Sequence, residues 1–123
     1  MHSDLIGIPF RYGGRGDGAF DCYGLVMELH KRRGIELPDY LSPKDKGVIA
    51  SMMASQVTLW RKVEEPEVGD VILMRIGIFN CHVGVLLDDN EFIHTYEASG
   101  GVCIESLSGW DRRIEGYYRY EGY

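Results

Sequence analysis

The sequence predicts an α+β domain in which N-terminal helices pack on a C-terminal antiparallel sheet of about five strands. Two patterns predict this class. Apolar residues recur at helical spacing in the first third of the chain, and segments rich in β-branched and aromatic residues fill the second half. The length of 123 residues fits a single domain over residues 1–123, with enough apolar residues for one buried core.

An apolar stripe at i, i+3, i+4 and i+7 predicts a helix over residues 22–33, and it consists of Cys22, Leu25, Val26 and Leu29. Asp21 precedes the stripe as an N-cap, and Gly34 follows it as a C-cap. His30 lies among charged residues of this helix, so we expect it to face solvent. A second helix is predicted over residues 45–56.

Five strands are predicted in the second half from its content of Val, Ile, Tyr and Phe. They cover residues 71–76, 82–87, 91–96, 102–107 and 117–120. Asp88-Asp89-Asn90 is a typical turn sequence between the second and third of these strands, and it predicts a hairpin.

Composition excludes several classes of protein. With 13 Lys+Arg against 19 Asp+Glu, the net charge is −6, and a nucleic-acid partner is not expected because phosphate binding needs a basic face. The three cysteines lack paired spacing, so neither a disulfide framework nor a structural zinc site is expected, and no metal or cofactor is predicted. No N-terminal signal pattern is present, and no stretch approaches the ~20 apolar residues of a membrane span.

Cys22 is the candidate nucleophile, because it falls in the first turn of the predicted helix. A helix N-terminus stabilises a thiolate through its positive dipole end, and glycines just upstream let a substrate approach. The alternative is that Cys22 is a small buried core residue. Cys81 and Cys103 are expected to be structural, since Cys81 points away from His82 on their shared strand and Cys103 lies in a core-like strand.

His82 and His94 lie on the two strands that flank the predicted turn. A three-residue turn sets Gly84 opposite His94 and Leu86 opposite Phe92, which places both imidazoles on one face of the sheet. His82 is then a candidate base and His94 the group that orients it. A four-residue turn would place them on opposite faces, and each would then be an ordinary, partly buried polar residue.

Five segments in this order resemble the NlpC-type bacterial cell-wall cysteine peptidases, over about residues 5–120: Phe10-Arg11-Tyr12-Gly13-Gly14, Phe20-Asp21-Cys22-Tyr23-Gly24-Leu25-Val26, Val68-Gly69-Asp70-Val71, His82-Val83-Gly84-Val85 and Phe92-Ile93-His94. The resemblance implies a papain-like fold and hydrolysis of amide bonds in peptidoglycan stem peptides without a cofactor. The usual target of the family is the bond between D-glutamate and a diamino acid. By position, Cys22 matches the nucleophile, His82 the base and His94 the third polar residue.

Four further residues are assigned to substrate binding or to the oxyanion: Tyr12, Tyr23, Asp21 and Arg11. Tyr12 matches an aromatic residue near the thiol in the family, although a core tyrosine with one buried hydrogen bond is an equal alternative. Tyr23 departs from the family pattern, in which serine often follows the nucleophile. Arg11 and Arg15 flank the glycine segment, where they either pair with a substrate carboxylate or are ordinary loop charges.

The short chain is similar to the branch of the family found in phage tail assembly proteins. That resemblance implies a protein of the producing cell's cytoplasm or of the virion tail, which acts on the bacterial wall, with other tail proteins as partners. Two alternatives remain at this point. One is a catalytically silent docking component of a tail tip, and the other is an acyltransferase on the same fold.

Overall fold

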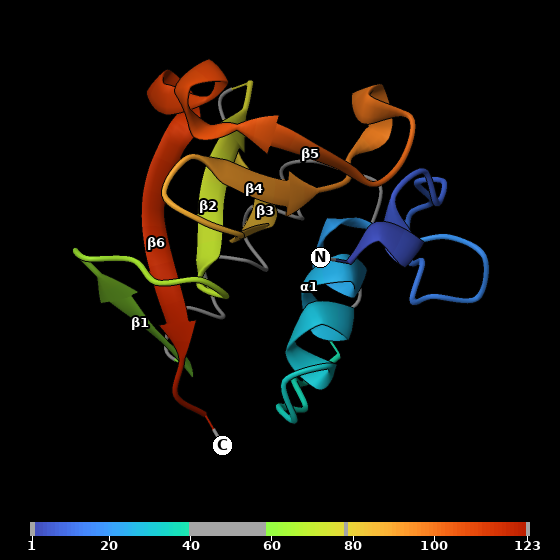
Figure 1. Ribbon diagram of the computed structural model, residues 1–123, viewed down its shortest axis with the longest axis horizontal. Helices are drawn as coiled ribbons and strands as arrows, with labels where there is room; N and C mark the ends of the chain where they lie inside the picture. The colour runs from blue at the N-terminus through green and yellow to red at the C-terminus, as the bar shows by residue number, and fades with distance from the viewer. Residues whose placement is uncertain (1, 40–58, 78, 123) are drawn as a thin grey trace.

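A sheet of six antiparallel strands forms one layer of the molecule, and helix α1 stands beside it (Figure 1). The computed structural model describes residues 2–39, 59–77 and 79–122, and for residues 79–81 it describes the backbone alone. The sheet has the order β1-β6-β2-β3-β4-β5. The elements along the chain are α1 (Cys22–Lys31), β1 (Trp60–Val63), β2 (Val71–Ile76), β3 (Phe79–Leu86), β4 (Glu91–His94), β5 (Cys103–Ser106) and β6 (Ile114–Tyr120).

The α+β class and the antiparallel sheet predicted from the sequence are confirmed, but the described residues form six strands of the sheet rather than about five. The strand that the sequence did not indicate is β1, an edge strand that pairs with β6 from Trp60↔Tyr120 to Val63↔Tyr117. It is only four residues long, and its two central residues, Arg61 and Lys62, are exposed and charged. Such a segment lacks the alternation of apolar and polar residues from which a strand is predicted. The predicted helix over residues 45–56 lies outside the described residues.

Helix α1 begins at Cys22, as the sequence predicts, because Asp21 caps it. The Asp21 carboxylate accepts a 2.6 Å hydrogen bond from the backbone N–H of Gly24, one of the donors that a helix start leaves without a helical partner. The helix ends at Lys31, two residues earlier than predicted. No helix among the described residues has the length and apolar character that crossing a membrane requires.

The two faces of strand β3 contact different sets of side chains. Val83 and Val85 belong to the core cluster that contains Leu25, Val26 and Leu29 of α1. Leu86, which points to the other side, packs in a second cluster formed with Ile72, Met74, Phe92 and Trp110. This alternation is what a strand buried on both faces requires, and it brings the apolar side of α1 onto the sheet.

His30 is buried, with an exposed fraction of 3%, so the expectation that it faces solvent is wrong. Its Nδ1–H donates to the backbone carbonyl of Val26 at 2.9 Å, and its ring packs against the edge of Trp60. The charged neighbours of His30 indicated an exposed side chain. The residue that covers it, Trp60, belongs to β1, a strand that the sequence did not indicate. Burial lowers the pKa of His30 below its ordinary value.

We expect the neutral, buried state of His30 to make the fold acid-sensitive. Below about pH 6.5 an exposed histidine in the unfolded chain takes up a proton, whereas His30 in the folded chain does not. The free energy of unfolding therefore falls as the pH drops from 7 to 5. Urea denaturation across this range measures it, and His30→Gln, whose amide also donates to a carbonyl, is expected to show a smaller fall. If the free energy of unfolding falls equally in the parent protein and in His30→Gln, His30 is not a source of the acid sensitivity.

Candidate active site

The start of α1 is fixed by a buried carboxylate. Asp21 has an exposed fraction of 1% and, besides capping Gly24, accepts hydrogen bonds from the Gly13 N–H at 3.0 Å and from Arg15 Nη1 at 2.7 Å. These bonds join the glycine-rich segment to the first turn of the helix. Asp21 is thus buried beneath the first turn of α1, and its assignment to substrate binding or to the oxyanion stays a prediction.

Cys22 is the first residue of α1 and is half-buried. It packs against the core cluster that contains Val83, the neighbour of His82 in the chain. The positive end of the helix dipole favours the thiolate form of a cysteine at this position. The thiol therefore combines an activating position with partial access from solvent.

His82 and His94 contact each other directly. His82 Nε2 lies 2.7 Å from His94 Nδ1, and both side chains are buried, with exposed fractions of 1% and 0%. The predicted register is confirmed, since Leu86 pairs with Phe92 and Val85 with Ile93. The three-residue turn is thus the one that forms, and it places the two imidazoles on one face.

Gly84 lets His94 lie close to strand β3. A side-chain carbon at position 84 would stand 3.1 Å from His94 Cβ and 3.0 Å from the ring of Phe92. That spacing is tighter than ordinary van der Waals contact, so a larger residue would press His94 away from the strand. Glycine in the His-Val-Gly-Val segment therefore supports the contact between the two imidazoles.

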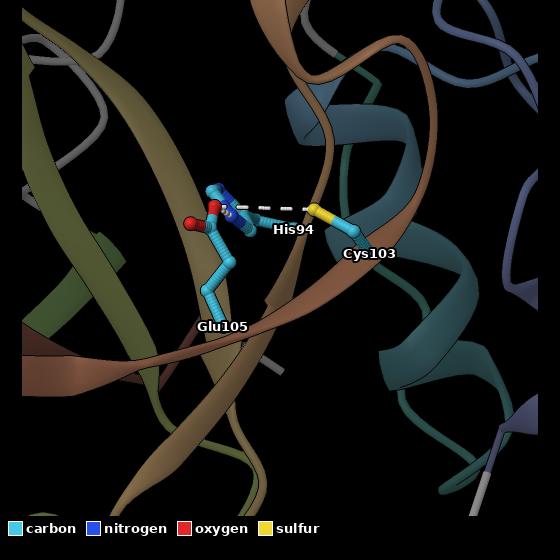
Figure 2. Close-up of side chains that lie close together, drawn as sticks. All are labelled: His94, Cys103 and Glu105. Carbon is cyan, nitrogen blue, oxygen red and sulfur yellow. Dashed lines mark hydrogen bonds and ion pairs between the residues drawn. The ribbon is translucent and has the colours of Figure 1, made fainter. Parts of the chain in front are cut away.

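Glu105, which the sequence analysis did not single out, continues the chain of contacts. Its Oε2 lies 2.5 Å from His94 Nε2 (Figure 2). The residue comes from β5, whose register with β4 pairs Phe92 with Glu105 and His94 with Cys103. The sequence held one signal for this contact. Glu105 is an acidic residue on the predicted strand that follows His94, at a position whose side chain can share a face with the histidine.

The carboxylate determines where the ring protons lie. An ionised carboxylate only accepts, so His94 Nε2 carries the proton and donates to Glu105. His94 Nδ1 is then an acceptor for the Nε2–H of His82. The remaining nitrogen of His82, Nδ1, keeps its lone pair. The Nδ1 lone pair of His82 is chemically able to accept a proton, as the predicted base requires.

Burial keeps both imidazoles neutral. It lowers the pKa of His82 well below the ordinary value, and the neighbouring His94 lowers it further. It also lowers the pKa of His94, against an opposing effect of the hydrogen bond to Glu105. Neutral rings at neutral pH are the form that a general base requires.

Aromatic rings hold the two histidines in place. The ring of His94 stacks on Tyr96 at a centroid distance of 5.4 Å, and Trp110 meets it edge-on at 5.2 Å. Trp110 also lies 5.7 Å from His82 and is itself buried. Trp110 was not predicted as part of the site, because it reaches the histidines from the turn between the 3-10 segments Leu107–Gly109 and Asp111–Arg113, outside the matched motifs.

Tyr12 is half-buried and its hydroxyl donates to Glu97 Oε2 at 2.7 Å. Both residues line a shallow, open depression together with Phe10 and Arg11. Arg11 itself is exposed and pairs with Asp17 at 3.0 Å. The depression brings two of the sequence-predicted binding residues, Tyr12 and Arg11, onto one surface.

Tyr23 does not join that surface. It is buried, with an exposed fraction of 3%, and its hydroxyl donates to the carbonyl of Pro38 at 2.7 Å. Arg15 binds Asp21 and Asp39 in the same region. The phenol that replaces the usual serine therefore packs into the core beneath the helix.

The sequence model of the NlpC/P60 family matches residues 7–119. The chain is 28% identical over 118 residues to the murein DD-endopeptidase MepS/murein LD-carboxypeptidase of Escherichia coli K12, covering 92% of this chain and 56% of that protein. It is also 28% identical over 119 residues to the probable peptidoglycan endopeptidase LytE of Bacillus subtilis 168, covering 94% of this chain and 31% of that protein. The chain thus spans about half of the first relative and a third of the second.

Solved structures show the same fold. A lipoprotein-like NLP/P60 family protein of Staphylococcus aureus superposes with a TM-score of 0.70 at 25% identity, covering 95% of this chain and 38% of that one. NlpC1 of Trichomonas vaginalis superposes with a TM-score of 0.73 at 20% identity, over 95% and 40% of the two chains. The fold is the papain-like α+β fold of cysteine peptidase domains. The chain belongs to the NlpC/P60 family.

Proposed function

We propose that this chain is a cysteine peptidase that hydrolyses amide bonds in peptidoglycan stem peptides, with Cys22 as nucleophile and His82 as base. The observation that carries the proposal is the hydrogen-bonded series His82–His94–Glu105, in which both histidines are buried and whose hydrogen bonds leave the lone pair of His82 Nδ1 available. The substrate class is supported by relatives that are named murein or peptidoglycan endopeptidases.

In the proposed mechanism, His82 Nδ1 takes the proton of the Cys22 thiol and the thiolate attacks the carbonyl carbon of the scissile amide. The N-terminal end of α1 stabilises the oxyanion that forms. His82 then gives its proton to the leaving amine, and a thioester joins the acyl group to Cys22. Water, deprotonated by the same imidazole, hydrolyses the thioester and restores the thiol. His94 keeps the His82 ring in one orientation and one tautomer throughout.

The bond that is cut is the finer part of the proposal. The family resemblance favours the bond between D-glutamate and a diamino acid, whereas the E. coli relative is named for DD-endopeptidase and LD-carboxypeptidase activities. Digestion of defined muropeptides, with the new amine located by mass spectrometry, distinguishes these bonds. Absence of any new amine from all of them would contradict peptidase activity.

A silent docking component is the competing function, and thiol reactivity separates the two. If the site is active, a thiolate-selective alkylating agent near neutral pH modifies Cys22 well before Cys81 and Cys103. Equal, slow modification of all three would favour the silent component. An acyltransferase would instead give products joined to an added amine. A role in a phage tail stays a prediction from the resemblance, since the relatives described above are not named as phage proteins.

We expect Glu105→Ala to lower kcat by about tenfold to a hundredfold with little change in KM. Without the carboxylate, the proton of His94 is no longer held on Nε2. His94 Nδ1 then no longer reliably accepts the hydrogen bond from His82 Nε2–H that keeps the His82 ring in its working tautomer. Glu105→Gln is expected to recover part of the rate, since its amide oxygen still accepts from His94 Nε2. Steady-state kinetics on a defined muropeptide measures both. If Glu105→Ala only lowers the melting temperature and leaves kcat unchanged, the residue has a structural role alone.

A further inference from the structure

Three side chains of different chemistry converge at the outer edge of the sheet. A ring nitrogen of His94, the Sγ atom of Cys103 and a carboxylate oxygen of Glu105 all lie within 4.8 Å of one another, and Nε2 is the nitrogen that contacts Glu105. Figure 2 shows the Cys103 sulfur directed toward the carboxylate, at 3.9 Å from Glu105 Oε2. Cys103, which the sequence placed in a core-like strand, is only half-buried.

The strand register builds this cluster. His94 on β4 pairs directly with Cys103 on β5, so their side chains leave the sheet on the same face. Glu105 lies two residues further along β5 and therefore shares that face. Strand β5 is an edge of the sheet, and the Glu105 side chain has an exposed fraction of 40%. The cluster therefore borders solvent on the side of Glu105 and Cys103, while His94 forms its buried side.

We infer that His94, Cys103 and Glu105 form a binding site for a divalent transition-metal ion, with zinc as the preferred ion. Zinc prefers imidazole nitrogen, thiolate sulfur and carboxylate oxygen, and three protein ligands leave its fourth tetrahedral position to water. Magnesium and calcium prefer sites made of oxygen alone, so this mixed set disfavours them. Linear motif spacing does not reveal the site, because its ligands come from two strands.

Metal binding at this site moves the ring protons of His94 and His82 from Nε2 to Nδ1. The effect on activity that follows rests on the proposed function. A metal on His94 Nε2 takes the lone pair of that atom, so the ring carries its one proton on Nδ1 and donates it to His82 Nε2. His82 then carries its own proton on Nδ1, the atom that must accept the Cys22 proton. Each ring keeps one proton, and Cys103 releases one to solvent. The ion therefore switches the peptidase off.

Cobalt titration tests the site without any need for activity. The chain has three cysteines, so the variant Cys22→Ala/Cys81→Ser keeps Cys103 as its single thiol. With Co²⁺ it is expected to develop a saturable thiolate-to-cobalt absorption band in the near ultraviolet, which Zn²⁺ removes by competition. Adding Cys103→Ser is expected to abolish the band. No saturable band, or one that persists in the triple variant, overturns the site.

A second arm tests the switch. Cys103→Ser with Cys22 intact is expected to keep its basal rate and to need about tenfold or more Zn²⁺ for half inhibition, because one ligand of the site is lost. Equal inhibition of both proteins places the inhibiting ion at Cys22 and overturns the switch, while the cobalt result stands on its own. If the protein hydrolyses no muropeptide at all, the proposed function fails and the cobalt titration still decides the metal site.

Discussion

Replacing Cys22 with alanine is expected to abolish hydrolysis of muropeptides and to leave the fold intact, lowering kcat by about 10⁴-fold or more. In the proposed mechanism the sulfur atom of Cys22 forms the thioester, and the methyl group of alanine cannot take that role. Its deletion leaves a small space at a half-buried position, so the expected loss of stability is modest. Mass spectrometry of digested muropeptides measures the activity, and circular dichroism with thermal melting measures the fold.

The other two cysteines provide the matched control. Cys81→Ser and Cys103→Ser remove a thiol of the same chemistry, and both are expected to retain hydrolysis. A Cys22→Ala protein that still releases the new amine at a comparable rate rules out Cys22 as the nucleophile. Loss of activity in all three variants, with unchanged melting temperatures, would instead point to a shared requirement for thiols, and it too would contradict the assignment.

Replacing Gly24 with alanine is expected to destabilise the fold by about 3 kcal/mol or more, because the new methyl group has no room. A Cβ atom at this position would stand 2.1 Å from the carbonyl oxygen of Gly14. That oxygen accepts hydrogen bonds from the backbone of Asp21 and from Arg15 Nη1, so it cannot move without breaking the network that caps α1. Alanine favours a helix over glycine by only about 1 kcal/mol, which does not offset the clash.

Urea denaturation measures the loss, and the muropeptide assay is expected to show reduced kcat in any fraction that folds, since the clash displaces the start of α1. Gly109→Ala is the matched control. No atom lies within 4 Å of the position of its added Cβ among the described residues, so its stability is expected to change by less than about 0.5 kcal/mol. Similar stabilities of the two variants would show that the contact between Gly14 and Gly24 is not restrictive.

Local sequence was sufficient for the parts of the site that depend on short spacing. The apolar stripe after Asp21 placed the helix start at Cys22, where the structure has it. The turn sequence at Asp88 predicted the hairpin, and of the two turn lengths considered the structure forms the three-residue one, which places His82 and His94 on a shared face. Both inferences depend on neighbours within about a dozen residues, over which the periods of helix and strand hold.

The α+β class, the family motifs and the helix start thus follow from the sequence, whereas the histidine pair was predicted for only one of two turn lengths. Tertiary structure alone decided the burial of His30 beneath β1, the packing of Trp110 against both imidazoles and the meeting of Glu105 and Cys103 with His94. These contacts join segments whose pairing is set by the order and register of the strands in the whole sheet. No local period encodes that order, because the free energy of burying each face depends on every strand at once.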